Sequence, residues 1–132
     1  MLSYYGEVSK WESNRLTLQT LPIDFYYQLN SKTAPEWSRI GLTNPYHHLE
    51  IGPSPISHRI PRIEKNPDFI EIALLVAAEK QSGEIIGSAG FHDFPDGHGT
   101  IEVGFGVVPE KQNQGYGKEI LFSMWSLIRV LM

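Results

Sequence analysis

The second half of the chain shows the clearest ordering of apolar and polar positions. Residues 72–78 form an uninterrupted apolar run, which predicts a central strand buried on both faces. Two further strand-like runs follow at residues 85–92 and 100–108, and short segments rich in glycine and polar residues separate them. The second of these segments contains an Asp-Gly pair at 96–97, which is typical of tight hairpins. We therefore predict an antiparallel meander of three strands.

A helix is predicted after the last of these strands. Residues 118–132 repeat apolar side chains every three or four positions, as an amphipathic helix does. Such a helix covers one face of the sheet that precedes it, so we expect its apolar side chains to pack there. These side chains are Ile120, Leu121, Met124, Trp125, Ile128 and Leu131.

The first half of the chain is less regular. Leu16 and Leu18 alternate with polar residues and predict a half-buried strand, whereas residues 1–13 have a mixed composition and are interpreted as an N-terminal extension. A helix is predicted to begin at Asp24, the expected N-cap. Residues 41–68 contain five prolines, and because proline interrupts helical hydrogen bonding, we predict a long loop there.

Length and composition restrict the class of protein. A chain of 132 residues is long enough for a single domain with its own core. The net charge of −4 argues against a nucleic-acid partner, because such proteins carry an excess of lysine and arginine. The chain has no cysteine, which excludes thiolate chemistry, and no apolar stretch long enough to span a membrane. No basic region followed by an apolar core is visible at the N-terminus, so we expect a cytoplasmic protein.

The residues between the last predicted strand and the helix carry the strongest functional signal. The sequence Gln112-Asn113-Gln114-Gly115-Tyr116-Gly117 places two glycines where the helix begins. The first backbone N–H groups of a helix have no partners within it, and glycine lets an anion approach them closely. The segment is therefore predicted to bind a phosphate group, although an ordinary strand-to-helix connection would also use glycines.

Two other phosphate-binding motifs do not fit these residues. A Walker loop needs Ser or Thr after its lysine and a glycine five residues before its last glycine, but this chain has Glu119 and Gln112 at those positions. A dinucleotide fingerprint that began at Gly104 would need its third glycine where Pro109 stands.

The strand, the loop and the helix together resemble the acetyl-CoA-binding segment of the GNAT N-acetyltransferases. Gln112-x-x-Gly115-x-Gly117 matches the Gln/Arg-x-x-Gly-x-Gly/Ala loop of that family, and residues 102–108 resemble its fourth strand. Residues 14–19 are similar to the first strand of the branch that acetylates ribosomal-protein N-termini. The resemblance implies an α+β fold with an antiparallel-rich central sheet and packed helices. It also implies acetyl transfer from acetyl-CoA to a primary amine, either a protein N-terminus or a small amine.

The resemblance also assigns roles to particular residues. Glu102 matches a strand position that carries a carboxylate in several family members, and it is the candidate general base, directly or through water. A solvent-facing Glu102 without a catalytic role is an equally open interpretation. The backbone N–H of Val107 is the candidate donor to the thioester carbonyl. The residues expected to bind the pantetheine arm are Phe105, Gly106, Val107 and Val108, and those expected at the pyrophosphate are Gln112, Gln114, Gly115, Tyr116, Gly117 and Lys118.

Histidine and aspartate residues supply further candidates. His92 and Asp93, at the end of the neighbouring predicted strand, are second-choice residues for contact with the acceptor. The segment from His92 to His98 holds nitrogen and oxygen ligands that suit a metal, but the Asp-Gly turn explains the same residues, and we predict no metal site. His47 and His48 lie in the proline-rich segment and are expected to be solvated.

The chain departs from the family pattern at its C-terminus. Met132 ends the predicted helix, whereas family members continue with another strand, another helix and a final hairpin. We therefore expect an open sheet edge and an apolar helix face that a second copy or another chain covers. The alternatives to an active enzyme are a CoA-binding remnant, a subunit that needs a partner to complete its site, and a truncated reading frame.

Overall fold

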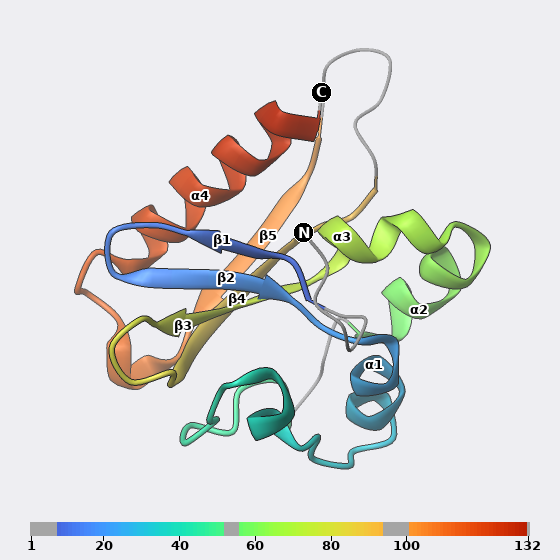
Figure 1. Cartoon of the computed structure of the whole chain (residues 1–132), viewed down its shortest axis with the longest axis horizontal. Helices are drawn as coiled ribbons and strands as arrows, with labels where there is room; N and C mark the ends of the chain where they lie inside the picture. The colour runs from blue at the N-terminus through green and yellow to red at the C-terminus, as the bar shows by residue number, and fades with distance from the viewer. Residues whose placement is uncertain (1–7, 52–55, 94–100, 132) are drawn as a thin grey trace.

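A computed structural model of the chain describes residues 8–51, 56–93 and 101–131. The described part contains a five-stranded antiparallel sheet in which each strand pairs with the next one in sequence (Figure 1). The order β1-β2-β3-β4-β5 makes β5 one edge of the sheet and β1 the other. The strands are β1 (Lys10–Glu12), β2 (Leu16–Thr20), β3 (Leu75–Glu79), β4 (Ile85–Phe91) and β5 (Val103–Val107).

Strands β3, β4 and β5 confirm the predicted meander. Residues 80–84 turn between β3 and β4, and the N–H of Glu79 donates to the carbonyl of Glu84 at 3.0 Å. The Asp-Gly pair at 96–97, which we expected in the second turn, lies outside the described residues.

The predicted start of the central strand is wrong. Residues Ile70–Ala73 form the short helix α3, and the chain becomes extended only from Leu74. The cause lies just upstream, where the side chain of Asn66 accepts a hydrogen bond from the N–H of Asp68 at 3.3 Å. This cap begins the 3₁₀ helix η2 (Pro67–Phe69), which runs directly into α3. The apolar run is therefore shared between a buried helical turn and the strand.

The described part of the N-terminal segment contributes a strand to the sheet. Residues 10–12 form β1, which pairs with β2 in a register that sets Trp11 against Leu18. The N–H of Ser9 donates to the Thr20 side chain at 2.8 Å, which fixes the beginning of this hairpin.

Helix α1 (Ile23–Asn30) confirms the predicted helix but begins differently. Pro22 occupies the N-cap and Asp24 lies in the first turn, so Asp24 is not the cap that we predicted. Its carboxylate instead accepts two hydrogen bonds from Arg39, at 2.6 and 2.9 Å. These bonds lower the pKa of Asp24 and tie α1 to the 3₁₀ helix η1 (Trp37–Ile40).

Helix α2 (Ile56–Lys65) corrects the prediction of a long loop over residues 41–68. Pro61 lies inside this helix and cannot donate to the carbonyl four residues earlier, but it stands on the exposed side, where that loss is tolerated. Apolar burial outweighs the proline, because the isoleucines recur at helical spacing and pack into the core. They are Ile56, Ile60 and Ile63.

Helix α4 (Tyr116–Leu131) crosses one face of the sheet, where it contacts β1, β2, β4 and β5. Leu121 and Trp125 are 37% and 61% exposed, so the prediction that they pack against the sheet is wrong. Leu121 and Trp125 lie about 75° and about 115° around the helix axis from the centre of the buried side chains, at the margin of the face that the sheet covers and beyond it. The side chains buried under α4 are Ile120, Met124, Leu127 and Ile128. The helices of the described residues include none with the length and apolar content needed to cross a bilayer.

Helix α3 lies on the opposite face of the sheet from α4. A Cβ built on Gly90 of β4 would lie 2.0 Å from the carbonyl oxygen of Ala73 in α3. Gly90 pairs with Gly104 of β5. Phe105, the residue after Gly104, instead lies against α4 at Gly117. Because successive residues of a strand face opposite sides, α3 and α4 enclose the sheet between them.

Candidate functional site

The predicted phosphate loop connects the 3₁₀ helix η3 (Pro109–Lys111) to α4. Asn113 and Gly115 adopt positive φ angles of 64° and 84°, which glycine tolerates best. The N–H of Glu119 donates to the carbonyl of Gly115 at 3.1 Å, so the helical ladder begins there. The N–H groups of residues 116–118 precede this first bond and face out of the helix N-terminus, where an anion is favoured.

Arg15, which the sequence did not point to as a site residue, holds this loop in shape. Its Nη1 donates to the Gln114 carbonyl at 3.0 Å, and its Nε pairs with Glu119 at 2.8 Å. Its guanidinium carbon lies 4.1 Å from the centroid of the Tyr116 ring. Glu119 also accepts from Ser13, and although burial raises the pKa of Glu119, the bonds from Ser13 and Arg15 lower it on balance.

Tyr116 anchors the beginning of α4 to the sheet. Its buried side chain donates a hydrogen bond to the Glu79 carboxylate at 2.6 Å, and Lys111 reaches the same carboxylate at 3.5 Å. The bond from Tyr116 lowers the pKa of Glu79, and the same bond raises the pKa of the Tyr116 hydroxyl. The loop is therefore held from the β1–β2 turn through Arg15 and from β3 through the bond between Tyr116 and Glu79.

The backbone of β5 presents alternate residues to the open edge of the sheet. The N–H of Val108 donates to the Ile86 carbonyl at 2.8 Å, which directs Val108 toward β4. Residues two apart on an antiparallel strand share this orientation, so Gly106 also faces β4, while Phe105 and Val107 direct their backbone groups outward. Of the four residues predicted to bind pantetheine through the backbone, Phe105 and Val107 therefore have the right orientation.

Gln112 joins this edge to the phosphate loop. Its Nε2 donates to the carbonyl of Val107 at 3.0 Å, so that carbonyl is already bonded. The N–H of Val107 points to the open edge, beside the start of α4. The predicted thioester donor and the predicted anion site are thus consecutive along one edge.

Small residues of β4 and β5 form the floor of a pocket of about 330 Å³. Ser88 pairs with Gly106 and Gly90 pairs with Gly104, so these four residues share the face opposite α4. A Cβ built on Gly106 would meet no atom of the described residues within 4 Å. The floor therefore leaves room for a small group. Further lining residues are His48, Leu49, Ile51, Arg59, Leu74 and His92.

His48 is half-buried in this pocket, so the prediction that it is solvated is wrong. Its Nε2 lies 2.8 Å from Ser88 Oγ, and burial lowers its pKa below the ordinary value. His47 is exposed, as expected, and pairs with Glu50 at 3.1 Å. The sequence could not distinguish the two histidines, because the contact of His48 is with a strand 40 residues away.

The predicted base Glu102 and the predicted acceptor residues His92 and Asp93 lie where β5 begins and β4 ends. Glu102 is exposed, and its carbonyl accepts from the N–H of His92 at 3.1 Å. His92 lines the pocket, whereas Asp93 pairs with Arg62 at 2.6 Å. The parts of the chain that the structure describes hold no group of three or more His, Cys, Asp or Glu suited to a metal, and His98 lies outside them.

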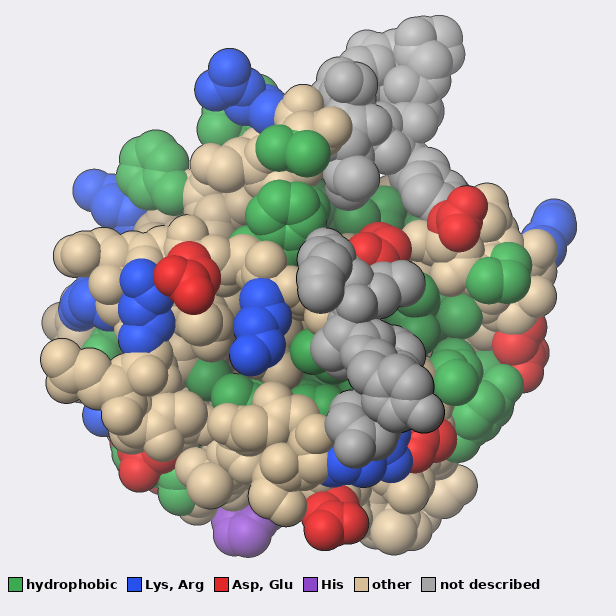
Figure 2. Space-filling view, in the orientation of Figure 1, with side chains coloured by type: hydrophobic (Ala, Val, Ile, Leu, Met, Phe, Trp, Pro, Cys, Tyr) green, Lys and Arg blue, Asp and Glu red, His purple; other side chains and the backbone are tan. Residues whose placement is uncertain are grey.

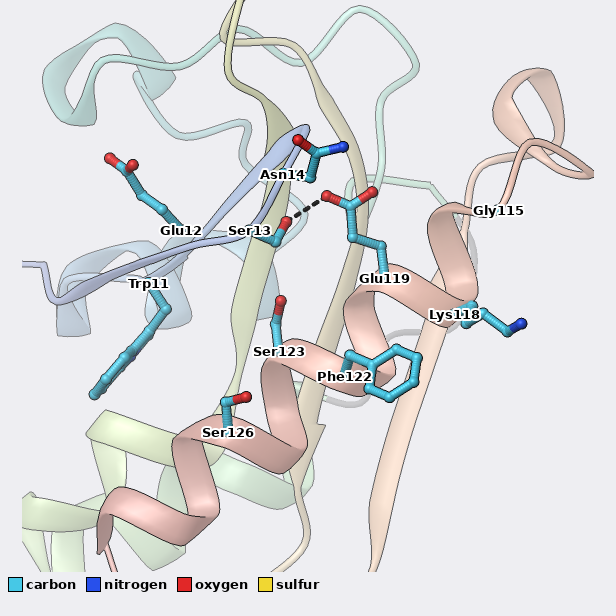
Figure 3. Close-up of a pocket in the computed structure, with 10 residues that line it drawn as sticks. All are labelled: Trp11, Glu12, Ser13, Asn14, Gly115, Lys118, Glu119, Phe122, Ser123 and Ser126. Atoms are coloured by element: carbon cyan, nitrogen blue, oxygen red, sulfur yellow. Dashed lines mark hydrogen bonds between the residues drawn. The ribbon is translucent and has the colours of Figure 1, made fainter.

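A larger groove of about 480 Å³ lies between the β1–β2 turn and the first turns of α4 (Figure 3). Glu119 reaches across it to Ser13, while Lys118 points away from that turn. The Glu119 carboxylate in this groove already accepts hydrogen bonds from Ser13 and Arg15 of the same chain. Gly115 and Lys118 place the predicted pyrophosphate site at its rim.

Solved structures similar to this chain are acetyltransferases. An acetyltransferase from Agrobacterium tumefaciens str. C58 is 19% identical, with a TM-score of 0.55 over 100% of this chain and 74% of its own. A Vibrio cholerae protein described as a ribosomal-protein-serine acetyltransferase is 19% identical, with a TM-score of 0.52 over 91% of this chain and 66% of its own. A GNAT-family acetyltransferase from Bacillus anthracis is 14% identical, with a TM-score of 0.50 over 89% of this chain and 64% of its own.

These likenesses establish the fold, and the chain spans about two thirds to three quarters of the length of these proteins. No curated protein matches the chain in sequence. The profile of the acetyltransferase (GNAT) domain matches residues 15–129, which include β2 through α4 and nearly the whole described sheet. The chain therefore belongs to the GNAT acetyltransferase family.

Proposed function

We propose that the protein transfers an acetyl group from acetyl-CoA directly to a primary amine. The observation that carries this proposal is the consecutive placement of an outward Val107 N–H and the open N-terminus of α4, linked by Gln112. A thioester and a pyrophosphate separated by a pantetheine arm need these two features on one edge. The glycines at 115 and 117 leave the helix N–H groups accessible to a bulky anion.

Acetyl-CoA supplies an activated acyl group, and the chain's own groups hold and polarise it. In this proposal the amides of residues 114–118 bind the pyrophosphate, and the outward backbone groups of Phe105 and Val107 pair with the peptide-like arm as an added strand. The Val107 N–H then donates to the thioester carbonyl, where negative charge develops. One preorganised donor of this kind lowers the barrier by about 3–4 kcal/mol.

The need for a base depends on the acceptor. A lysine amine costs about 4 kcal/mol to deprotonate near pH 7.4, whereas an α-amine costs less than about 1 kcal/mol. Glu102 remains our candidate base for this step, and its exposed position suits a route through water. The neighbour described as a ribosomal-protein-serine acetyltransferase makes a peptide with a free N-terminal serine the first acceptor to test.

The test is calorimetric titration of the purified chain with acetyl-CoA, CoA and ATP in parallel. The proposal predicts micromolar binding that is selective for the two CoA compounds, followed by release of CoA thiol when an amine acceptor is added. Equal binding of ATP would indicate a general phosphate site. No binding of acetyl-CoA would contradict the proposal.

We further propose that a second copy or another chain covers the open edge of β5 and the adjoining face of α4. The support is a group of exposed apolar side chains on this side of the molecule (Figure 2). Contiguous exposed apolar surface is typical of association sites. The residues of this surface, called here the α4 apolar face, are Phe105, Leu121, Phe122 and Trp125.

A further inference from the structure

His48 closes one wall of the pocket that lies over β4 and β5. Its Nε2 is 2.8 Å from Ser88 Oγ, which is within the distance for direct proton transfer. Ser88 stands beside Gly106, its cross-strand partner, on the open floor of the pocket. Hydroxyl and imidazole therefore form a continuous polar path from the glycine floor into the protein.

The segment that carries His48 is fixed in place. Asn44 Oδ1 accepts from the N–H of His48 at 3.0 Å, and Asn44 Nδ2 donates to the His48 carbonyl at 2.9 Å. The carbonyl of Thr43 accepts from the N–H of Ile85 at 2.9 Å, which ties the segment to β4. Leu49 keeps a φ of 69°, a conformation that a non-glycine residue holds only when its surroundings impose it. The imidazole is thus preorganised.

The pocket adjoins the edge on which the thioester is proposed to lie. Ser88 pairs with Gly106, and Gly106 precedes Val107. Neighbouring strands lie about 4.8 Å apart, so Ser88 is about one strand spacing from β5 and about two from an arm paired along its outer edge. An amine that enters over Gly104 and Gly106 therefore lies between Ser88 and the thioester carbonyl, and a water spans the remaining distance to Ser88.

We propose that His48 accepts the proton of the incoming amine through the hydroxyl of Ser88. This inference rests on the proposed acetyl transfer and adds a second proton path to it. Glu102 deprotonates the ammonium form before the attack, and His48 receives the proton that the amine nitrogen loses once it has bonded to the carbonyl carbon. The amine nitrogen bonds to the thioester carbonyl carbon, and a water between the amine and Ser88 takes one amine proton while giving one of its own to Ser88 Oγ. Ser88 passes its own hydroxyl proton to His48 Nε2. The carbon–sulfur bond then breaks, CoA leaves as the thiolate, and the imidazolium returns the proton to the thiolate through water. The products are an amide and CoA thiol, with both side chains restored.

The surroundings of His48 suit this role. Burial lowers its pKa, so the imidazole is neutral and able to accept a proton near pH 7. The other charged or titratable groups that line the pocket are Arg59 of α2 and His92 at the end of β4. On the segment of His48 itself, His47 and Glu50 pair with each other at 3.1 Å.

The test compares the wild-type chain with His48→Asn, Ser88→Ala and the matched control His47→Asn. His47 is exposed and has a φ of 55°, which asparagine tolerates, so its replacement changes a neighbouring histidine outside the pocket. Acetyl-CoA binding is measured by calorimetry. Transfer is followed by release of CoA thiol, with peptides that bear a free N-terminal serine, a free N-terminal alanine or a lysine side chain. The rates are recorded from about pH 5 to about pH 9, which spans the ordinary pKa of histidine.

We expect kcat/KM to fall about 100-fold in His48→Asn and Ser88→Ala, with acetyl-CoA affinity unchanged and the control equal to wild type. Below the lowered pKa of His48, the amine and His48 must both lose a proton before the reaction. As the pH falls through that pKa, the slope of log(kcat/KM) against pH should therefore increase from one toward two in the wild type and stay at one in His48→Asn. A purely structural role would not change that slope. Ser88→Ala removes a single oxygen, and it carries the test should His48→Asn fail to fold.

Three results would overturn the inference. Wild-type rates and slopes in both variants would overturn it and leave the proposed function intact. Acetylated Ser88, found by mass spectrometry without a peptide acceptor, would make Ser88 a nucleophile and not a relay. A wild-type chain that binds no acetyl-CoA, or transfers to none of the three peptides, would overturn the proposed function and this inference with it.

Discussion

Arg15 and Gln114 are 99 residues apart in the sequence, yet Arg15 Nη1 lies 3.0 Å from the carbonyl oxygen of Gln114. The same guanidinium pairs with Glu119 and stacks over Tyr116. One side chain in the β1–β2 turn therefore holds both the predicted phosphate loop and the first turn of α4.

Replacement of Arg15 by lysine should weaken acetyl-CoA binding about tenfold. Lysine keeps the charge, but its single ammonium group cannot bond Gln114 and Glu119 while stacking on Tyr116. We expect a loss of stability of about 1 kcal/mol, because the arginine is partly exposed and water screens its ion pair. Calorimetry and thermal unfolding measure the two effects.

Arg62→Lys is the control for this change. Arg62 pairs with Asp93 at the surface, where the side chains are 50% and 65% exposed. We expect neither affinity nor stability to change measurably. An Arg15→Lys variant that binds acetyl-CoA as tightly as wild type would show that Arg15 does not shape the ligand site.

Gly117→Glu should abolish acetyl-CoA binding without unfolding the protein. A Cβ at this position would lie 3.4 Å from the Phe105 ring, an ordinary contact, and a carboxylate in the first turn suits the helix dipole. The same carboxylate repels a pyrophosphate at the helix N-terminus. Calorimetry checks binding, and circular dichroism checks that α4 is intact.

Ser126→Glu adds the same charge to the same helix and is the matched control. Ser126 is exposed and lies about 13 Å along the helix axis from Gly117. The affinity of the Ser126→Glu variant for acetyl-CoA should equal that of the wild type. Retained binding in Gly117→Glu would refute the assignment of the phosphate loop.

The connection from β5 to α4 at residues 112–117 and the β4–β5 part of the meander were predictable because their signals are local. Alternating or continuous apolar runs determine strands, and two glycines after a strand determine a tight entry to a helix. The start of α3 was not predictable in this way, since an apolar run at residues 72–78 has the same composition whether it is extended or helical. A side-chain cap from Asn66 decides it.

The remaining errors concern contacts between distant segments. Pro61 led us to predict a loop, but the burial of Ile56, Ile60 and Ile63 stabilises helix α2 by more than the proline destabilises it. His48 gained its role from a strand 40 residues away, and Arg15 gained its role from the loop before α4, 99 residues away. Spacing along a sequence reports which face a side chain occupies, but not what stands opposite that face.

Tyr116→Phe should lower stability by about 1 to 2 kcal/mol near neutral pH, because it removes a hydrogen bond to a charged carboxylate. The pKa of Glu79 is lowered, so its contribution is present above the unfolded value near 4.3 and is lost as pH falls through the folded pKa. The pKa of Tyr116 is raised, so its contribution is present below about 10 and is lost as pH rises through the folded pKa. Thermal midpoints of variant and wild type should therefore converge at both ends of the pH range.

Tyr27→Phe is the control for this pH dependence. Tyr27 also donates to a carboxylate, Glu64, at 2.5 Å, but its side chain is 43% exposed. Water replaces this bond, so the midpoint should shift much less than in Tyr116→Phe. A constant difference between Tyr116→Phe and wild type from acid to alkaline pH would contradict the proposed coupling to Glu79.

Trp125→Glu should convert an associating chain into a monomer. Trp125 is 61% exposed in the middle of the α4 apolar face, next to Phe122 at 65%, and a charge there opposes burial against a partner. Size-exclusion chromatography with light scattering should give a mass above 15.0 kDa for the wild type at micromolar concentration and the monomer mass for the variant.

Ile51→Glu is the control, because Ile51 is 74% exposed and lies on the other side of the sheet. The Ile51→Glu variant should associate like the wild type. A wild-type chain that is monomeric at that concentration would exclude self-association and leave a different protein as the partner for this face.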